Sequence, residues 1–370
     1  MNVKKTATIT FHASHNYGSN LQAYALQQII IGLGCENEII NLRTERQKDL
    51  YTVFTKRKGI KCFIKNLSHL LYYFPLKRAY YKFEDFINNK LSTTKEYSNE
   101  EQLKEANLKY DVFIAGSDQI WNPIPKDFVW AYYLTFVDEG RKVSYASSFG
   151  QLASLGDNAT KDRISQNLKT FKAISVREQG ALDNVKALTG VTPQIVLDPT
   201  LLLTKNQWLD LVKDKRRIVN RDYIFFYTLF ADPERMDIVK RVSKITGLPI
   251  VTSNFSNQYD VFNPFIKKYD AGPLDFLTLV RDAKLVVASS FHGTVFSTLL
   301  NVPFFAIDGM SDARIRTLLE TTGLEHREIK TTNIEEKCSN AFDIDFQSVN
   351  ERIEAARISS IEFLKKSLEI

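Results

Sequence analysis

The sequence predicts an α/β protein made of two doubly wound domains that face each other across a cleft. At 370 residues, the chain is longer than one typical hydrophobic core requires. Short apolar runs rich in β-branched residues recur along it, and most of them are followed by polar residues and a helical pattern. This alternation is typical of parallel sheets that carry helices on both faces.

The first domain is expected to span residues 1–200. It opens with a strand at Thr6–Phe11, and a polar turn at His12–Asn20 then leads into an amphipathic helix. Similar apolar runs predict further strands at Glu38–Leu42, Asp111–Ala115, Lys142–Ala146 and Ala173–Val176, and one more within Gly190–Leu203.

The second domain is expected at residues 201–345, after a connection near Pro199–Lys205. Its strands are predicted at Tyr223–Tyr227, Pro249–Thr252, Leu285–Ala288 and Phe304–Ile307. Residues 346–370 are predicted to form a closing helix, because the apolar residues between Val349 and Leu368 fall near one helical face.

Composition excludes several classes of protein. The formal net charge of +6 is mild for this length, so no nucleic-acid partner is expected. The three cysteines form no CxxC pair, which argues against a metal site and favours a reducing cytoplasm. The longest apolar run, Tyr223–Phe230, is far shorter than the roughly 18 residues of a membrane span. GxxxxGK[ST], GxGxxG, HExxH and GxSxG motifs do not occur in the sequence.

One basic insertion, Thr55–Lys82, carries eight Lys or Arg residues, several aromatic residues and no Asp or Glu. Cations interleaved with aromatic side chains are typical of segments that contact a membrane surface. The insertion therefore predicts peripheral contact with an anionic membrane or with a lipid diphosphate acceptor at the inner membrane face. The alternative is a solvated basic helix.

The stretch Lys284–Leu300 changes from a strand pattern to a helical pattern across a short polar turn. His292 and Gly293 fall at this turn, where free backbone N–H groups and the helix dipole favour an anion. The pattern predicts a site for a phosphorylated or carboxylated ligand. An ordinary, partly buried turn histidine is the alternative.

Two polar groups in the first domain are candidates for binding a sugar. The first group is the turn Asn16, Tyr17, Gly18, Ser19 and Asn20, unless Ser19 or Asn20 simply caps a helix. In the second group, Asp118 and Asn122 lie beside Trp121, whose ring offers a face to a carbohydrate. An Asp helix cap with a core tryptophan is the alternative for this group.

Arg177 directly follows the predicted strand Ala173–Val176. A guanidinium held at this position is able to grip a phosphate or carboxylate through two parallel hydrogen bonds. Because Glu178 is adjacent, a structural ion pair is the alternative.

Six blocks together resemble the polysaccharide pyruvyl transferase family, from about Thr8 to Ile307. In chain order they are NYGSNLQAYALQ, DVFIAGSDQIWN, YASSFG, ISVRE, VLDPTLLL and ASSFHGTVFSTLLNVPFF. The resemblance implies a GT-B-like fold with two Rossmann-like domains. It also implies transfer of the pyruvyl group of phosphoenolpyruvate to a sugar of a bacterial surface polysaccharide, or of its lipid-linked precursor. The product is a pyruvate ketal.

The resemblance also assigns roles. Arg177 matches the family arginine that holds phosphoenolpyruvate, and His292 matches the donor-site histidine that we expect to act as general acid. Asp118 is the candidate base. The donor site comprises Arg177, Ser290, Phe291, His292, Gly293 and Thr294, with Ser290 standing where some members have arginine. The first domain is then the acceptor side and the second the donor side, with no cofactor besides the donor substrate. A glycosyltransferase that uses a nucleotide sugar, or a non-catalytic glycan-binding protein, is the alternative.

Overall fold

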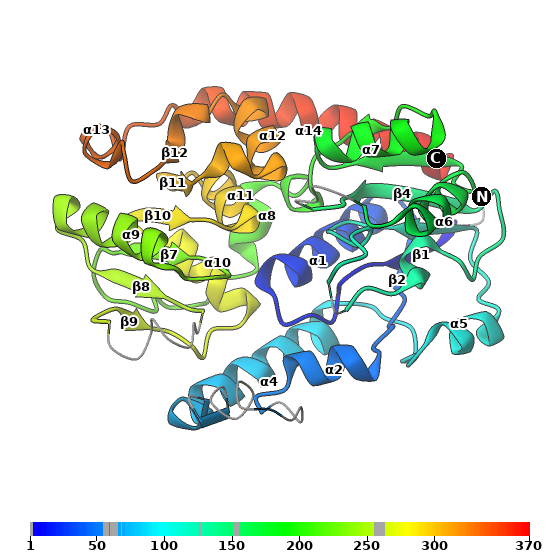
Figure 1. The fold of residues 1–370 in the computed structure, drawn as a ribbon, viewed down its shortest axis with the longest axis horizontal. Helices are drawn as coiled ribbons and strands as arrows, with labels where there is room; N and C mark the ends of the chain where they lie inside the picture. The colour runs from blue at the N-terminus through cyan, green and yellow to red at the C-terminus, as the bar shows by residue number, and fades with distance from the viewer. Residues whose placement is uncertain are drawn as a thin grey trace. The chain divides into compact units, whose positions relative to one another are not determined.

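The computed structural model describes residues 3–54, 59, 66–67, 69–125, 127–150, 155–254 and 263–370. Part of the predicted basic insertion, including Lys56, Arg57, Lys58 and Lys61, lies outside these ranges. The chain divides into two compact units (Figure 1). Unit 1 contains residues 1–51, 84–203 and 354–370, and unit 2 contains residues 52–83 and 204–353. Residues 52–83 thus belong with the second unit, although the sequence placed them in the first.

Unit 1 contains a six-stranded parallel sheet in the order β2-β1-β3-β4-β5-β6. The strands are β1 (Lys5–Ile9), β2 (Glu36–Ile39), β3 (Val112–Ala115), β4 (Lys142–Ser147), β5 (Ala173–Val176) and β6 (Gln194–Ile195). The helices are α1 (Tyr17–Gly32), α2 (Glu45–Tyr51), α5 (Glu100–Ala106), α6 (Asn158–Leu168) and α7 (Gln179–Thr189). Every residue of β3 and β4 is buried, as is usual for central parallel strands.

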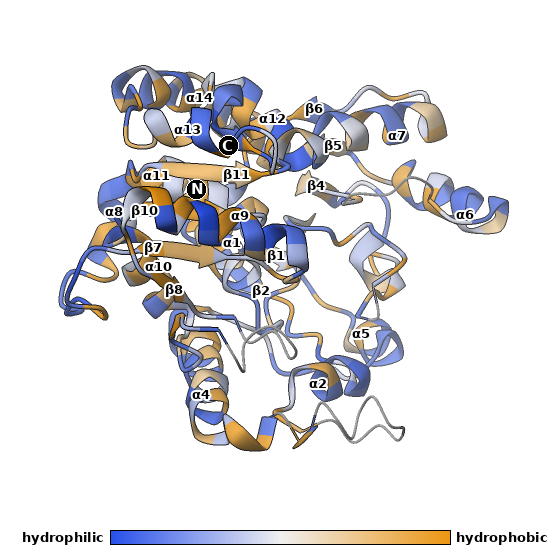
Figure 2. Cartoon of the chain, turned by 60° about the vertical axis from the view of Figure 1, so that its left-hand side comes forward, coloured by the Kyte–Doolittle hydropathy of each residue, from blue (hydrophilic) through white to orange (hydrophobic). Residues whose placement is uncertain are grey.

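Unit 2 contains a second six-stranded parallel sheet, in the order β12-β11-β10-β7-β8-β9. Its strands are β7 (Ile224–Tyr227), β8 (Ile250–Thr252), β9 (Ile266–Lys267), β10 (Leu285–Ala288), β11 (Phe304–Ile307) and β12 (Glu328–Ile329). Its helices are α8 (Lys205–Asp210), α9 (Pro233–Thr246), α10 (Pro273–Arg281), α11 (Phe291–Leu300), α12 (Ala313–Thr322) and α13 (Ile334–Ser339). The central strands β7, β10 and β11 are apolar along their length, which Figure 2 shows in orange.

Two long helices continue from one unit into the other. Helix α4 (Tyr73–Lys90) passes the division between Phe83 and Glu84, and α14 (Phe346–Leu368) passes it between Ile353 and Glu354. No helix in the described part of the chain is both long and apolar enough to cross a membrane.

Each sheet has one point where the strand order reverses. In unit 1 the chain continues from β1 to β2 on one side and later to β3 on the other. In unit 2 it continues from β7 through β8 to β9 on one side, and β10 pairs with the opposite edge of β7. Open α/β sheets bind ligands at the carboxyl ends of the strands that flank such a reversal. The β1/β3 and β7/β10 strand ends are therefore the positions where this fold favours a ligand.

Helix α1 begins earlier than the sequence indicated. Tyr17 is its first residue because the Asn16 side chain caps it, accepting hydrogen bonds from the backbone N–H groups of Gly18 at 2.9 Å and Ser19 at 3.3 Å. The residues up to Asn20 thus lie in the first helical turn and not in a loop. The predicted alternative, a cap formed by Ser19 or Asn20, was wrong in the identity of the capping residue.

Candidate active site

The carboxyl ends of β1 and β3 are joined by hydrogen bonds. Thr10 Oγ1 donates to the Ser117 carbonyl at 2.9 Å. The Gln22 side chain links the two loops, because its Nε2 donates to Thr10 Oγ1 at 2.8 Å and its Oε1 accepts from the Ser117 N–H at 3.2 Å. The next residue, Asp118, has a φ of 77°, in the left-handed region. Ser19 Oγ donates to Asp118 Oδ2 at 2.6 Å. The start of α1 therefore orients a largely buried carboxylate at this reversal point.

Arg177 lies among three carboxylates. Its guanidinium contacts Asp198 at 2.7 Å, Asp118 at 3.6 Å and Glu178 at 3.7 Å, and its side chain is only 2% exposed. Burial alone lowers the pKa of the Arg177 guanidinium, but the neighbouring carboxylates outweigh burial and raise it. The ion pair with Glu178 that formed the alternative is present, although Asp198 is nearer. The assignment of Arg177 to the donor stays a prediction.

The segment after β6 supplies Asp198, which the sequence analysis did not single out as a site residue. Asp198 also accepts hydrogen bonds from the Thr200 backbone N–H at 3.0 Å and the Thr200 hydroxyl at 2.7 Å. Helix α14 holds this segment, since Arg357 Nε donates to the Leu201 carbonyl at 2.9 Å and Ser360 Oγ accepts from the Leu197 N–H at 3.0 Å. An acidic residue directly after a strand was the signal that could have revealed it.

Two of the candidate acceptor residues have side chains that contact other residues of the protein. Trp121 is 0% exposed and stacks on Tyr133, with ring centroids 5.7 Å apart and an interplanar angle of 11°. Asn122 accepts a hydrogen bond from the Ile124 N–H at 3.0 Å. The tryptophan thus occupies the core, as the alternative reading had it, and offers no face to a sugar in this structure. Asp118 caps no helix here, because a turn follows it.

The other candidate acceptor residues organise the start of α1. Asn20 is buried and donates to the His12 carbonyl at 2.6 Å, and Tyr17, Gly18 and Ser19 are also buried. Ser19 is the member of this group whose side chain reaches a second candidate residue, Asp118. Their role in binding a sugar stays a prediction.

In unit 2, His292 is the second residue of α11, directly after the carboxyl end of β10. The loops at the β7/β10 reversal are tied together by Thr228 Oγ1 and Ser289 Oγ, which lie 2.7 Å apart. A Cβ on Gly293 would lie 2.8 Å from Ala288 Cβ and 2.9 Å from Tyr227 Cδ1, so only glycine lets α11 begin this close to the sheet. The helix N-terminus that the sequence predicted as an anion site is therefore placed where this fold binds ligands.

Arg314 is a cation near this helix start that the sequence analysis did not single out. Its guanidinium carbon lies 5.9 Å from the Phe291 ring centroid, and the Phe291 ring lies 5.1 Å from that of His292. Asp312 pairs with Arg314 at 2.6 Å. Burial alone raises the pKa of the Asp312 carboxyl, but Arg314 outweighs burial and lowers it. Ser290 stands at the N-cap position without a capping hydrogen bond from its side chain.

A second ionic cluster in unit 1 follows β1 and β2 in the chain. Arg43 donates three hydrogen bonds to Glu84, at 3.0 Å from Nη1 to Oε2, 2.7 Å from Nη2 to Oε1 and 3.0 Å from Nη2 to Oε2. His15 Nε2 lies 2.8 Å from Glu84 Oε1. Burial alone raises the pKa of the Glu84 carboxyl, but hydrogen bonds from His15 and Arg43 lower it to about 2. The sequence analysis missed this cluster.

Replacing Glu84 by glutamine should reduce the acid sensitivity of folding. The pKa of Glu84 falls from its ordinary value of 4.5 to about 2 on folding, so its stabilisation is complete above pH 4.5 and is lost as the pH drops toward 2. We expect Glu84→Gln to remove about 1–2 kcal/mol of the stability lost over this range. Urea unfolding at several pH values measures it, with the exposed Glu45→Gln as control. Equal acid sensitivity in the two variants would contradict the assignment.

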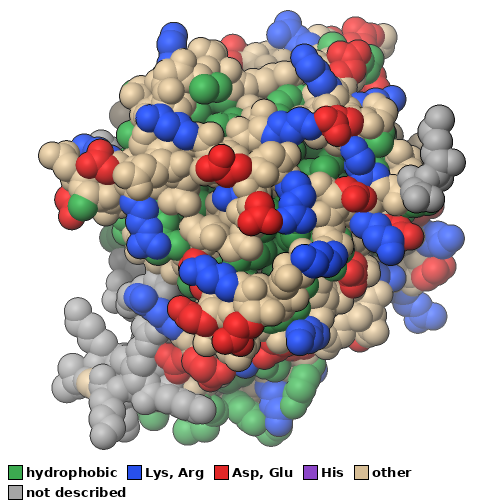
Figure 3. All heavy atoms as spheres, turned by 90° about the vertical axis from the view of Figure 1, so that its right-hand side faces the viewer, with side chains coloured by type: hydrophobic (Ala, Val, Ile, Leu, Met, Phe, Trp, Pro, Cys, Tyr) green, Lys and Arg blue, Asp and Glu red, His purple; other side chains and the backbone are tan. Residues whose placement is uncertain are grey.

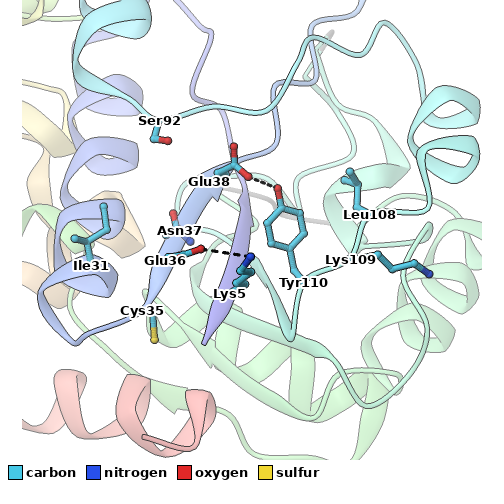
Figure 4. Close-up of a pocket in the computed structure, with 10 residues that line it drawn as sticks. All are labelled: Lys5, Ile31, Cys35, Glu36, Asn37, Glu38, Ser92, Leu108, Lys109 and Tyr110. Carbon is cyan, nitrogen blue, oxygen red and sulfur yellow. Dashed lines mark hydrogen bonds and ion pairs between the residues drawn. The ribbon is translucent and has the colours of Figure 1, made fainter. Parts of the chain in front are cut away.

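A hollow of about 570 Å³ opens at the amino ends of β1 and β2, and Figure 4 shows its lining. Lys5 and Glu36, the first residues of these strands, form an ion pair in it at 3.9 Å. This hollow lies at the sheet edge opposite the carboxyl ends, and it contains none of the predicted site residues. Within the described ranges, no group of three or more His, Cys, Asp or Glu residues is placed to hold a metal ion.

Solved structures similar to this chain share its fold at low identity. A Methanocaldococcus jannaschii UDP-GlcNAc 2-epimerase in complex with UDP-GlcNAc and UDP is 12% identical, covers 95% of this chain and 99% of its own, and has a TM-score of 0.55. A Rickettsia bellii UDP-N-acetylglucosamine 2-epimerase is 9% identical, covers 99% of each chain and has a TM-score of 0.51. A comparison with curated protein sequences finds no match. These similarities confirm the predicted GT-B-like α/β fold of two domains.

The comparison with family models identifies a protein family and not only a fold. The family model described as polysaccharide pyruvyl transferase matches residues 16–309. That range contains Asp118 and Arg177 at the carboxyl edge of the first sheet and His292 at that of the second. Because the match spans well over half of the chain, this protein belongs to the polysaccharide pyruvyl transferase family.

Proposed function

We propose that this protein transfers the pyruvyl group of phosphoenolpyruvate to a sugar of a bacterial surface polysaccharide or of its lipid-linked precursor, forming a pyruvate ketal. The main observation that supports the proposal is the family match over residues 16–309. The position of His292 at the start of α11, at the β7/β10 reversal, adds support because an anionic donor suits such a helix start.

The charges of the two sites favour different substrates. Near the β1/β3 reversal, one guanidinium faces three carboxylates, a setting that suits a neutral hydroxyl better than a phosphate. At the β7/β10 reversal, the N-terminus of α11 provides positive potential for phosphate and carboxylate groups, and the nearby Arg314 is paired with a single carboxylate, Asp312. We therefore assign the sugar acceptor to unit 1 and phosphoenolpyruvate to unit 2.

In the proposed first step, His292 protonates the terminal methylene carbon of phosphoenolpyruvate. The C2 carbon then develops oxocarbenium character, and a sugar hydroxyl attacks it to form one C–O bond and releases its proton to solvent. The N-terminus of α11 stabilises the negative charge of the donor throughout. The donor site in this proposal is formed in unit 2 by Ser290, Phe291, His292, Gly293 and Thr294.

In the proposed second step, a second sugar hydroxyl forms a bond to C2 while the C2–O bond to phosphate breaks. Asp118 takes up a hydroxyl proton as base, and the phosphate leaves with the electron pair of the broken bond. Ser19 and Arg177 orient the Asp118 carboxylate, since both contact it. The products are one cyclic ketal and one phosphate for each phosphoenolpyruvate consumed.

A thermal shift assay tests the choice of donor. Phosphoenolpyruvate should raise the melting temperature, because a ligand at 100 times its Kd adds about 2.7 kcal/mol of stability. UDP should leave the melting temperature unchanged. Stabilisation by UDP and not by phosphoenolpyruvate would favour a glycosyltransferase that uses a nucleotide sugar. Stabilisation by glycans alone would favour a glycan-binding protein.

A further inference from the structure

Ser253 carries a buried hydroxyl that makes no hydrogen bond within the described part of the chain. The residue is only 4% exposed, so bulk water has little access to it. Buried polar groups of folded proteins are almost always hydrogen-bonded, and leaving one unpaired destabilises the fold. The unpaired hydroxyl of Ser253 therefore indicates a position where a ligand completes the hydrogen bonding.

Ser253 lies at the ligand-binding edge of the second sheet. It directly follows β8, which pairs with β7 so that Thr252 lies opposite Phe226. The next residue of each strand, Ser253 in one and Tyr227 in the other, therefore points to the same face of the sheet. The Tyr227 ring lies against the start of α11, since its Cδ1 is 2.9 Å from the position of a Cβ on Gly293. The Ser253 hydroxyl is thus on the face that α11 covers.

Hydrogen bonds connect the loops that follow β8, β7 and β10. Asn254 Nδ2 donates to the Thr228 carbonyl at 2.9 Å, and Thr228 Oγ1 lies 2.7 Å from Ser289 Oγ. Because β7 lies between β8 and β10, Ser253 and the start of α11 are two strand spacings apart, or roughly 10 Å. This separation suits a ligand with two anionic groups, one at each position.

Helix α10 covers the same face of the sheet as α11, but its start differs in charge. Phe276 of α10 contacts the rings of Tyr227 and Phe296, at centroid distances of 5.0 and 5.7 Å. The start of α10 already has an anion, because Asp275 Oδ2 accepts a hydrogen bond from the Gly272 N–H at 3.1 Å. The first turn of α11 contains no acidic residue, so its N–H groups favour an external anion.

Long-range attraction contributes little to the binding of an anion. On the face drawn in Figure 3, Lys and Arg side chains are interspersed with Asp and Glu, and such charges largely cancel for an approaching anion. The net charge of +6 is also mild for 370 residues. Affinity for an anionic donor therefore depends on local groups, such as the start of α11 and the Ser253 hydroxyl.

We propose that Ser253 is a donor-binding residue. Its hydroxyl donates to the carboxylate of phosphoenolpyruvate, while the N-terminus of α11 binds the phosphate. The two ends of the donor are then held at two different strand ends, which fixes the reacting C2 carbon between them. The inference rests on the proposed function, because it takes phosphoenolpyruvate as the donor.

Calorimetric titration of Ser253→Ala tests this contact. Phosphoenolpyruvate should bind about 10- to 100-fold more weakly than to the wild type, which is the loss expected for a hydrogen bond to a charged group. Inorganic phosphate has no carboxylate, so its affinity should not change. The urea midpoint should not fall either, because the hydroxyl has no hydrogen bond within the described part of the chain to lose.

Ser243→Ala is the matched control, since Ser243 Oγ in α9 donates to the Leu248 carbonyl at 2.6 Å. This control should lower the urea midpoint and leave phosphoenolpyruvate affinity unchanged. Unchanged phosphoenolpyruvate affinity in Ser253→Ala would overturn the inference and leave the proposed function standing. Equal weakening of phosphoenolpyruvate and inorganic phosphate would also overturn it, because Ser253 would then contact the phosphate. A wild type that binds inorganic phosphate but not phosphoenolpyruvate would refute the proposed donor and this inference together.

Discussion

Replacing His292 by glutamine is expected to lower turnover by about 10² to 10⁴ while changing phosphoenolpyruvate affinity little. Glutamine keeps hydrogen-bonding capacity at the start of α11 but cannot deliver a proton at neutral pH. The α11 N-terminus that attracts the donor is a backbone feature, which the substitution leaves in place. The loss should therefore appear in the rate of the chemical step, measured by single-turnover phosphate release, and not in calorimetric donor binding.

His326→Gln is the matched control, because His326 is another histidine of unit 2 and lies in the short helix Glu325–Arg327, which follows α12 in the chain. Its turnover and donor affinity should equal those of the wild type. If His292→Gln loses donor affinity and turnover in equal proportion, His292 is a ligand and not the acid. Asp118 would then be the next residue to test.

Replacing Arg177 by glutamine is expected to destabilise the fold by about 3–5 kcal/mol, because it leaves buried carboxylates without their cation. The Asp198 and Glu178 side chains beside Arg177 are 0% exposed, so water cannot compensate for the lost charge. Denaturant unfolding measures the effect as a lower midpoint at unchanged slope. Lys104→Gln, which removes an exposed ion pair with Glu100 in the same unit, should cost less than about 1 kcal/mol.

Equal stability of Arg177→Gln and Lys104→Gln would contradict the structural role of Arg177. Arg177→Lys then tests the donor role separately, because lysine keeps the charge but not the planar, two-pronged geometry. If Arg177 also holds the donor, calorimetry on the folded Arg177→Lys variant should show weaker phosphoenolpyruvate binding. Unchanged donor affinity would remove Arg177 from the donor site and leave it as the residue that positions Asp118.

The strands buried on both faces were predictable from the sequence. The predicted bounds of β5, β10 and β11 agree with the structure, because each is a short, largely apolar run followed directly by a polar or charged residue. The edge strands β9 and β12 were missed, since two residues are too few to show a period. The start of α1 was misplaced because three residues there, Asn16, Ser19 and Asn20, are all common helix caps, and only the structure shows which one is used.

The sequence placed each candidate residue at the end of its own strand, but it did not show which of these residues lie close together. Strand order, which locates the two reversal points, depends on pairings between distant segments. Asp198 and Arg177 are 21 residues apart, and His15 and Glu84 are 69 apart, so no local pattern connects either pair. For Trp121, the sequence left a sugar-facing ring and a core ring as alternatives, and the structure places the ring in the core beside Tyr133.

Mass spectrometry of a candidate lipid-linked sugar, incubated with the protein and isotopically labelled phosphoenolpyruvate, tests the proposed reaction most directly. The proposal predicts that the sugar gains the labelled pyruvyl group as a cyclic ketal and that phosphate is released in equal amount. The same incubation would include UDP-sugars as competing donors. A sugar that gains a hexosyl group from a UDP-sugar, with the labelled phosphoenolpyruvate left unconsumed, would contradict pyruvyl transfer.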